Sequence, residues 1–519
     1  MGQQCSRRRG NKARLILSTA LSYRPGMHNI FRHHFIGVQD LMRIGCFGML
    51  LLFLVLSGLA RSEASTSRDC TRFISPSGGG NGLASGSPYR VADFLAEAQE
   101  GYVGCMENGV YSGSASMVTP PRGRSGVSEN PITLRAMNDG HVTVDGEFVR
   151  GRLPLSFEKN DWWVIEGINF ARAAAVMFIA SSSHNVFRRV IAYDGSLTTN
   201  DHIVSVAWNS AENVFEDFAV FGPGRYTMMF FSGSHHNTCR RCWGRHEGSI
   251  TDSLVGPKAT FLMSYESASH TNTCENCLAT WHAISMPESF RYTTYDGTES
   301  PLAWAQGGSG YTIQHNVGMF LTSCTTGATS SQNTKVLGTI SYVLPSDHIS
   351  IGSGPTATFV DRDCHGQTVR DFVSYVPPSG FPGASSISML LGDLDSRGGN
   401  VMEQSTAIYP RGAAWPFQEP STWHIINYQA GNSISSVNSV WSNTGDGANL
   451  CYRYIDGTLT EEKLWPWPMN ERIKQATGNA GAYAGPCLQC TGGRFARTPV
   501  DVTADLESIL GPIPTTCRN

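Results

Sequence analysis

A short pattern of polar and hydrophobic residues recurs along the middle of the chain. Each copy has a serine, an asparagine three residues later, and bulky or apolar residues two and five positions after that asparagine. The four copies run over residues 182–190, 210–218, 234–242 and 269–277, and a weaker copy has Ser330 and Asn333. Their asparagines, Asn185, Asn213, Asn237 and Asn272, are 28, 24 and 35 residues apart. This spacing is typical of a solenoid whose coils share a strand and a corner but differ in loop length.

The pattern also indicates which side chains face inward. Successive coils of a stacked sheet lie about 4.8 Å apart, so equivalent side chains form ladders along the stack. An asparagine at a corner can bond to the amide groups of its neighbours and tolerates a sharp bend. Apolar runs such as 203–208, 226–231 and 261–265 precede the corners, and short β-branched or aromatic runs follow them. We therefore expect an all-β protein that forms a single right-handed parallel β-helix.

Composition supports this fold class. The chain of 519 residues contains 55 glycines and only 16% charged residues, and helix-like periodic segments are nearly absent. These properties suit many short strands joined by turns. Repeat proteins grow by adding coils, so the length does not require several domains. We expect the β-helix to occupy residues 65–450, with a short capping helix at 91–100 and a C-terminal capping segment with a short helix in residues 451–519.

Residues 1–64 are expected to be a leader and signal peptide. Arg43, the apolar run 49–59 and the small residues up to Ala64 follow the order of a secretory signal, and Met42 is an alternative start. Without these residues 30 basic residues (39 − 9) and 40 acidic residues (42 − 2) remain, a net charge of −10. The acidic charge argues against nucleic acid as a partner. We expect a secreted or periplasmic monomer that is not bound to a membrane after signal cleavage, and the alternative is that the apolar run stays as a single membrane anchor.

The N-terminal part carries a family resemblance. A strand from Phe73, a glycine-rich turn, the helix at 91–100 and the turn Gly109-Val110-Tyr111-Ser112-Gly113 follow one another, and strands with Asn130-Pro131-Ile132 and Val144-Asp145-Gly146 come next. This order resembles secreted right-handed β-helix proteins of the pectate-lyase-like superfamily. The resemblance implies the fold and a polysaccharide-active, extracellular protein. Lyases, hydrolases, epimerases and non-catalytic surface proteins share this fold, so it does not imply one reaction.

Two pairs of cysteines in the repeats have the spacing of zinc ligands. Cys239 and Cys274 stand at the repeat position of Phe187 and Phe215, while Cys242 and Cys277 stand at that of Val190 and Phe218. A cysteine at such a site behaves as a small buried apolar residue, and neighbours at coil spacing can form disulfides. We therefore predict buried thiols or coil-to-coil disulfides rather than a zinc site.

Aligning the coils on their asparagines brings polar residues together at the start of one strand. Asp201, Arg225 and Thr260 stand twelve positions before their asparagines, and Lys258 stands fourteen before. The loops that lead there hold further candidates: Asp194, His202, Arg245, His246, Glu247 and Asp252. Side chains on neighbouring coils would lie about 5 to 10 Å apart, the scale of one sugar ring. We predict the functional site at this end of the strand.

These residue types suit the cleavage of an acidic polysaccharide by β-elimination. Such a reaction needs a base, a cation beside the substrate carboxylate and an acid for the leaving oxygen. Lys258, Arg225, Arg245, His246 and Glu247 are the candidate catalytic residues, with Lys258 as base and Arg225 as a two-pronged carboxylate clamp. Asp201, His202 and Tyr226 are candidates for substrate binding.

Three alternatives stay open. Asp201, Glu247 and Asp252 could hold calcium or supply the carboxylate pair of a glycoside hydrolase, although no metal is required by the pattern. The Asn-Thr-Asp, Asp-Asp and Gly-His-Gly set of β-helical polygalacturonases is missing. The protein could also be a non-catalytic glycan-binding or cell-surface β-helix, in which case the same residues would be ordinary loop residues.

Overall fold

The computed structural model describes most of the expected solenoid. The described residues are 70–196, 201–222, 224–246, 258–265, 268–281, 291–293, 299–301, 316–322, 333–343, 356–362, 366–375, 386–391, 401–408, 425–427, 433–435, 438–440, 452–465 and 467–480. All of them belong to one compact unit, Ser67–Asn519. The expected leader at 1–64 lies outside the described residues.

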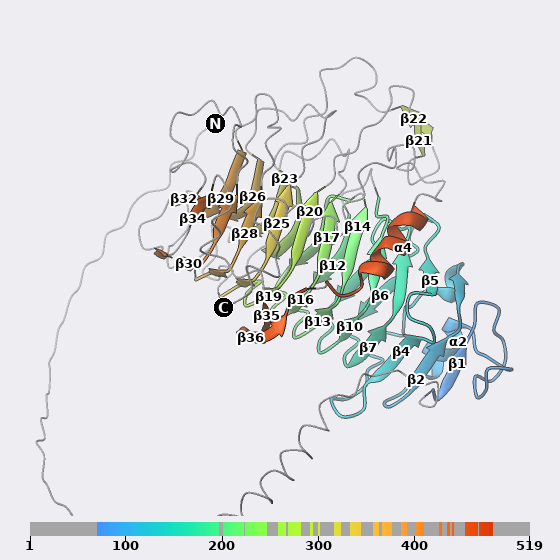
Figure 1. Ribbon diagram of the computed structural model, residues 1–519. Coiled ribbons are helices and arrows are strands. Elements are labelled where there is room, and N and C mark those ends of the chain that lie inside the picture. The colour runs from blue at the N-terminus through green and yellow to red at the C-terminus, as the bar shows by residue number, and fades with distance from the viewer. Residues whose placement is uncertain are drawn as a thin grey trace, which may run out of the picture. The chain divides into compact units, whose positions relative to one another are not determined.

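Three long, all-parallel sheets form the molecule (Figure 1). Sheet A contains β1 (Arg72–Ile74), β2 (Val103–Met106), β4 (Ile132–Ala136), β7 (Trp163–Glu166), β10 (Val186–Arg188), β13 (Val214–Glu216), β16 (Thr238–Arg240), β19 (Thr273–Glu275), β24 (Lys335–Leu337), β27 (Thr368–Arg370), β30 (Val401–Glu403) and β33 (Ser433–Ser435). Sheet B contains β3 (Gly109–Tyr111), β5 (Val142–Asp145), β8 (Ile168–Ala171), β11 (Ile191–Tyr193), β14 (Ala219–Gly222), β17 (Trp243–His246), β20 (Leu278–Trp281), β25 (Ile340–Val343), β28 (Val373–Tyr375), β31 (Thr406–Ile408) and β34 (Asn438–Val440). Sheet C contains β6 (Leu155–Glu158), β9 (Met177–Ala180), β12 (His202–Ala207), β15 (Tyr226–Phe231), β18 (Lys258–Tyr265), β23 (Asn316–Thr322), β26 (Thr356–Arg362), β29 (Ser386–Leu391) and β32 (Ile425–Asn427).

Each regular coil takes one strand from each sheet in the order C, A, B, as in β9, β10 and β11 or β12, β13 and β14. Every pairing within the three sheets is to the equivalent strand of the next coil, for example β10 with β13 and β13 with β16. This is a parallel β-helix, as the recurring pattern predicts. The smaller elements are the hairpins β21 (Arg291–Thr293) with β22 (Glu299–Pro301) and β35 (Tyr452–Ile455) with β36 (Thr458–Lys463), the 3-10 turn η2 (Ser114–Ser116), and the helices α2 (Val91–Glu97) and α4 (Asn470–Ala480).

The asparagine ladder lies at the corner between sheets C and A. The side-chain amide of Asn185 donates to Oδ1 of Asn213 at 2.9 Å, that of Asn213 to Asn237 at 2.9 Å, and that of Asn237 to Asn272 at 3.0 Å. All four side chains are fully buried. The predicted stacking of these asparagines in one line is therefore confirmed.

The weaker repeat copy was assigned one residue out of register. Lys335 pairs with Thr273, which places Thr334, and not Asn333, in line with Asn272. Asn333 instead has a φ of 61° and is exposed, so it takes the bend of the corner. Asparagine tolerates both the ladder site and the left-handed bend, and this is why the sequence pattern alone could not separate the two positions.

The N-terminal end of the solenoid is covered by α2, within the helix predicted at 91–100. Figure 1 shows α2 beside β1 and β2 at the blue end of the stack. Val91, Phe94 and Leu95 are buried in the same core as the inward side chains of the coils. The helix thereby removes the apolar lumen of the first coil from water.

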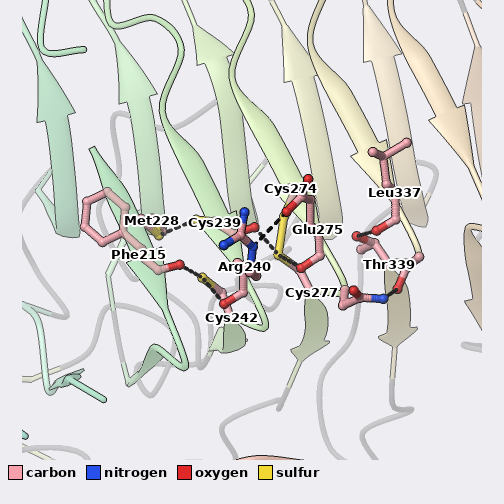
Figure 2. The surroundings of a disulfide bond; sticks show 12 residues. Phe215, Met228, Cys239, Arg240, Cys242, Cys274, Glu275, Cys277, Leu337 and Thr339 are labelled. Carbon is pink, nitrogen blue, oxygen red and sulfur yellow. Dashed lines mark hydrogen bonds and ion pairs between the residues drawn. A yellow bond between two sulfur atoms is a disulfide. The ribbon is translucent and has the colours of Figure 1, made fainter. Parts of the chain in front are cut away.

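The cysteines occupy the ladder positions that the repeat predicts. The register aligns Phe187, Phe215, Cys239 and Cys274 on consecutive strands of sheet A, and all four are buried. Cys239 and Cys242 are free thiols inside the core, whereas Cys274 and Cys277 form a disulfide within one coil (Figure 2). The pairing differs from the expected coil-to-coil disulfide because Cys274 and Cys277 flank the tight turn from sheet A to sheet B. A second disulfide joins Cys70 to Cys105 near the first coil.

The described part of the C-terminal tail packs along the flank of the solenoid instead of closing its end. Trp467, Met469 and Ile473 pack against the outer face of sheet B, in a cluster that includes Tyr193 and Trp243. Figure 1 shows α4 lying over the strands of the early coils. In the described residues the expected capping segment is thus a packed flap. No helix among the described residues is long and apolar enough to cross a membrane.

Candidate functional site

The longest connections of the solenoid lie at one corner, between the end of sheet B and the start of sheet C, as between β17 and β18 and between β20 and β23. In the coils from β9 to β17 the other two corners are short, with buried serines and asparagines between C and A and residues with positive φ such as Arg189 and Asp217 between A and B. Loops carry function more often than the scaffold that positions them. The edge where sheet C begins is therefore the first place to look for a site.

Asp201, Arg225 and Lys258 occupy equivalent positions at this edge on three consecutive coils. His202 pairs with Tyr226, and Tyr226 pairs with Ala259. Asp201, Arg225 and Lys258 each come directly before one of these residues, so they are level with one another on neighbouring strands. The backbone N–H of Arg225 also donates to the carbonyl of Asp201 at 3.0 Å. Adjacent strands are about 4.8 Å apart. The expected adjacency of Arg225 and Lys258 on neighbouring coils is confirmed.

The count from the asparagines had put Thr260, and not Lys258, level with Arg225. The difference has a local cause. Tyr226 and Met229 pair with residues 33 positions later, but Phe231 pairs with Tyr265, 34 positions later, because the pairing of β15 with β18 shifts there. The asparagines of the two coils are 35 positions apart. A bulge of this kind inserts residues without changing the register at the strand start.

His202 and Tyr226 form an aromatic cluster beside Arg225. The rings of His202 and Tyr226 are 5.3 Å apart, and the Arg225 guanidinium carbon lies 5.1 Å from the centre of the Tyr226 ring. The Nδ1 of His202 is 3.1 Å from Oγ of Ser205. Burial and the positive charge of Arg225 lower the pKa of His202 to about 3. His202 is therefore a neutral imidazole at pH 7, which can donate or accept a hydrogen bond.

Arg245 and His246 do not lie in a loop, as the sequence suggested, but in β17 of sheet B. The Arg245 guanidinium carbon packs 5.2 Å from the Phe221 ring and 5.6 Å from the Trp243 ring, and the residue is buried. His246 is also buried, and its Nε2 is 3.0 Å from the carbonyl oxygen of Gly224. That contact supports the backbone just before Arg225. Strand β17 ends only at His246, directly before the long connection to β18, and the hydrophobic periodicity of the sequence did not show where this strand ends.

Glu247 and Asp252 lie outside the described residues. Among the residues that the structure does describe, no three His, Cys, Asp or Glu side chains gather closely enough to hold a metal ion. Calcium therefore stays a prediction that rests on the sequence.

Sequence reasoning missed an aromatic group at the other end of sheet C. Trp208 follows β12 and is 49% exposed, and its ring meets the edge of the Phe178 ring at a centroid distance of 5.3 Å and an interplanar angle of 85°. On the neighbouring coils the equivalent residues are Ser181 and Ser232, as the backbone hydrogen bonds of the corner show. A tryptophan among serines in one repeat position was the signal that could have found it.

Comparisons with known proteins give matches of fold only. No family model matches the chain, and no curated protein matches it. Among solved structures, the chain is similar to pectate lyase Pel9A, with 15% identity, 77% of this chain and 90% of that chain covered, and a TM-score of 0.40. A rhamnogalacturonan lyase gives 14% identity, 78% and 97% coverage and a TM-score of 0.38. An alginate lyase from Paenibacillus sp. str. FPU-7 gives 13% identity, 67% and 96% coverage and a TM-score of 0.30. The fold that the resemblance implied, a parallel β-helix, is confirmed by the parallel register of the three sheets and not by these scores.

Proposed function

We propose that the protein cleaves a uronate-containing polysaccharide by β-elimination at the edge where sheet C begins. The observation that carries the proposal is the column of Asp201, Arg225 and Lys258 on three consecutive coils, with two cationic residues in adjacent positions. Two neighbouring cations attract an acidic chain and stabilise charge that develops on its carboxylate. Because such polysaccharides lie outside cells, the proposal includes secretion of a mature chain.

Carboxylate binding and proton removal each have a candidate residue. Arg225 binds the substrate carboxylate with its planar fork of donors. Lys258, as the neutral amine favoured by a neighbouring guanidinium, removes the proton from the carbon next to that carboxylate. The bond from the following carbon to the glycosidic oxygen then breaks, a carbon–carbon double bond forms, and the leaving oxygen takes its proton from water. His202 and Tyr226 contact the same bound sugar.

The test replaces the two cationic residues one at a time. General-base catalysis typically contributes about 100- to 10,000-fold, so Lys258→Ala should lose most of the rate. Arg225→Lys should also fail, because lysine keeps the charge but cannot form the two-pronged bond. The rate is measured as the ultraviolet absorbance of the unsaturated product on a panel of uronate polysaccharides. Lys335→Ala is the matched control, since Lys335 is exposed and also begins a strand, but in sheet A.

Two results would redirect the proposal. Lyase activity that survives both substitutions would move the chemistry to other residues. Activity that disappears with a chelator and returns with added calcium would assign the cation role to a bound ion instead of Lys258 or Arg225 alone.

A non-catalytic glycan-binding protein is the second candidate. It is favoured by the burial of Arg245 and His246 in sheet B, which leaves few ionisable groups of catalytic type at the described edge of sheet C. Binding of an acidic polysaccharide that depends on Arg225 without formation of any unsaturated product would establish this function.

A further inference from the structure

Trp208 adopts a backbone conformation that costs free energy and gains no burial from it. Its φ is 53°, and the φ of the next residue, Asn209, is 62°. A bulky side chain in this left-handed region is sterically strained. Ser181 and Ser232, with φ of 49° and 50°, have the same conformation on the two adjacent coils. The corner therefore requires the bend but does not require an indole.

Trp208 is also part of a strip of aromatic side chains on the outer face of sheet C. Phe178 points outward because Met177 and Ile179, on either side of it, are in the core. Phe231 lies on the next strand, level with Ala207, and its ring is 5.7 Å from the His202 ring. The His202 ring is in turn 5.3 Å from Tyr226, on which Arg225 packs. Phe178, Phe231 and His202 are all partly exposed. The strip therefore has an aromatic end at Trp208 and a cationic end at Arg225.

The dimensions of the strip suit a chain of sugars better than a single sugar. Trp208 lies six positions after His202, which at about 3.3 Å per residue corresponds to roughly 20 Å of backbone along the strand. Aromatic rings offer flat apolar faces to the carbon–hydrogen faces of sugars, while the guanidinium at the other end fits a carboxylate. An isolated exposed hydrophobic residue needs no explanation. Trp208 does need an explanation, because its backbone is strained, its ring is held by the Phe178 ring, and it lies in line with Arg225.

We infer that Trp208 and Phe178 form a sugar-stacking subsite, several sugar units away from Arg225, for the same acidic polysaccharide chain. The inference rests on the proposed binding of that chain at Arg225. It assigns Phe178 a supporting role, because its edge contacts the indole, and Trp208 the direct contact with the sugar ring.

The experiment compares binding in a Lys258→Ala background, so that no chain is cleaved. Trp208→Asn removes the ring, and asparagine suits the left-handed bend. The affinities for polygalacturonate and alginate, and for the disaccharides of each, are measured by calorimetry. We expect long-chain affinity to fall about three- to tenfold, and disaccharide affinity at Arg225 to stay unchanged. Trp162→Asn is the matched control, because Trp162 also has a positive φ of 58° but its ring is stacked on His184 at 4.2 Å.

The outcomes separate the inference from the function it rests on. Unchanged long-chain affinity in Trp208→Asn, with binding lost in Arg225→Lys, overturns the subsite and leaves the proposed function standing. No binding of any uronate chain by the parent protein rejects the proposed function itself. A fall in the free energy of unfolding for Trp208→Asn would show that the indole stabilises the fold, whereas we expect that free energy to be unchanged or higher.

Discussion

At the scale of single residues, the corner asparagines contribute more than their size suggests. Asn237 donates from its side chain to the Ser210 carbonyl and to Asn272 Oδ1, and its own Oδ1 accepts from the backbone and side-chain N–H groups of Asn213. All of these groups are buried. Each buried polar group that loses its partner costs about 1 to 3 kcal/mol, so a ladder asparagine fixes the coil below and the coil above together.

We therefore predict that Asn237→Ala lowers the free energy of unfolding by about 3 kcal/mol or more, measured by urea denaturation. Asn333→Gly is the control, because Asn333 is exposed at the same corner with a φ of 61°, which glycine adopts without strain. It should change the unfolding free energy by less than about 1 kcal/mol. Equal losses in the free energy of unfolding for the two substitutions would mean that the buried ladder contributes no more to stability than an exposed corner residue does.

The second prediction at this scale concerns pH. The pKa of His202 is about 3 in the folded protein and 6.5 in an unfolded chain. Between these values only the unfolded state binds the proton, so the free energy of unfolding falls as pH decreases from about 6.5 towards 3. His202→Asn should flatten this dependence between pH 7 and pH 5. Some slope should remain, because burial and neighbouring histidines also lower the pKa of His235 and His270. A slope identical to that of the parent would show that His202 titrates normally.

At the scale of elements, the C-terminal flap joins coils that are distant in sequence. At one end the backbone N–H of Tyr454 donates to Asn276 Oδ1 at 2.6 Å. At the other end Arg472, in α4, donates to Asp139 at 2.8 Å and to Asn169 at 2.6 Å. Between these ends Trp467 and Met469 cover the outer face of sheet B. The flap thus spans several coils of one sheet.

The contacts of Arg472 give the third prediction. Burial lowers the pKa of Arg472 to about 10, so it remains charged at pH 7 and needs its partners. Arg472→Met should lower the free energy of unfolding by about 1 to 3 kcal/mol and speed amide hydrogen exchange in α4 while the sheets stay protected. Gln475→Ala, at an exposed position of the same helix, should leave exchange in α4 unchanged. Faster exchange throughout the sheets would mean that the flap folds as one unit with the solenoid.

The elements also show what the sequence could and could not predict. Sheets A, B and C were predictable because Asn185, Asn213, Asn237 and Asn272 fix the phase of each coil. The position of the flap was not, because Arg472 bonds to residues 333 and 303 positions earlier and no repeat links them. In the site, counting from the ladder residues brought Arg225 and Lys258 to the same strand end, but the shift in register between β15 and β18 hid that the two are level. Trp208 was missed because it departs from the repeat instead of following it.

At the scale of the whole molecule, a coil interacts mainly with the coils next to it. Arg188 pairs with Glu216 at 3.1 Å and Arg240 pairs with Glu275 at 3.0 Å, each on the neighbouring strand of sheet A. Stability in such an array is close to a sum of coil terms and nearest-neighbour interface terms. The number of coils can then change without loss of the fold, provided that the phase of the strands is kept.

The last prediction tests this property by deletion. Removing residues 186–213 joins Asn185 to Val214 and takes out one whole coil, so β7, β8 and β9 meet β13, β14 and β15 in phase. We expect a folded protein with a parallel-sheet circular dichroism spectrum, cooperative thermal unfolding and a lower midpoint, since the flap must also adjust to a stack about 4.8 Å shorter. Removing residues 214–237, the next whole coil, should give the same result with 24 residues lost instead of 28.

The contrasting deletion removes only residues 186–199, half as many as the first. It brings β12 to the place of a strand of sheet A and should prevent folding. If that shorter deletion folds as well as the whole-coil deletions, the coil is not the unit on which the molecule is built.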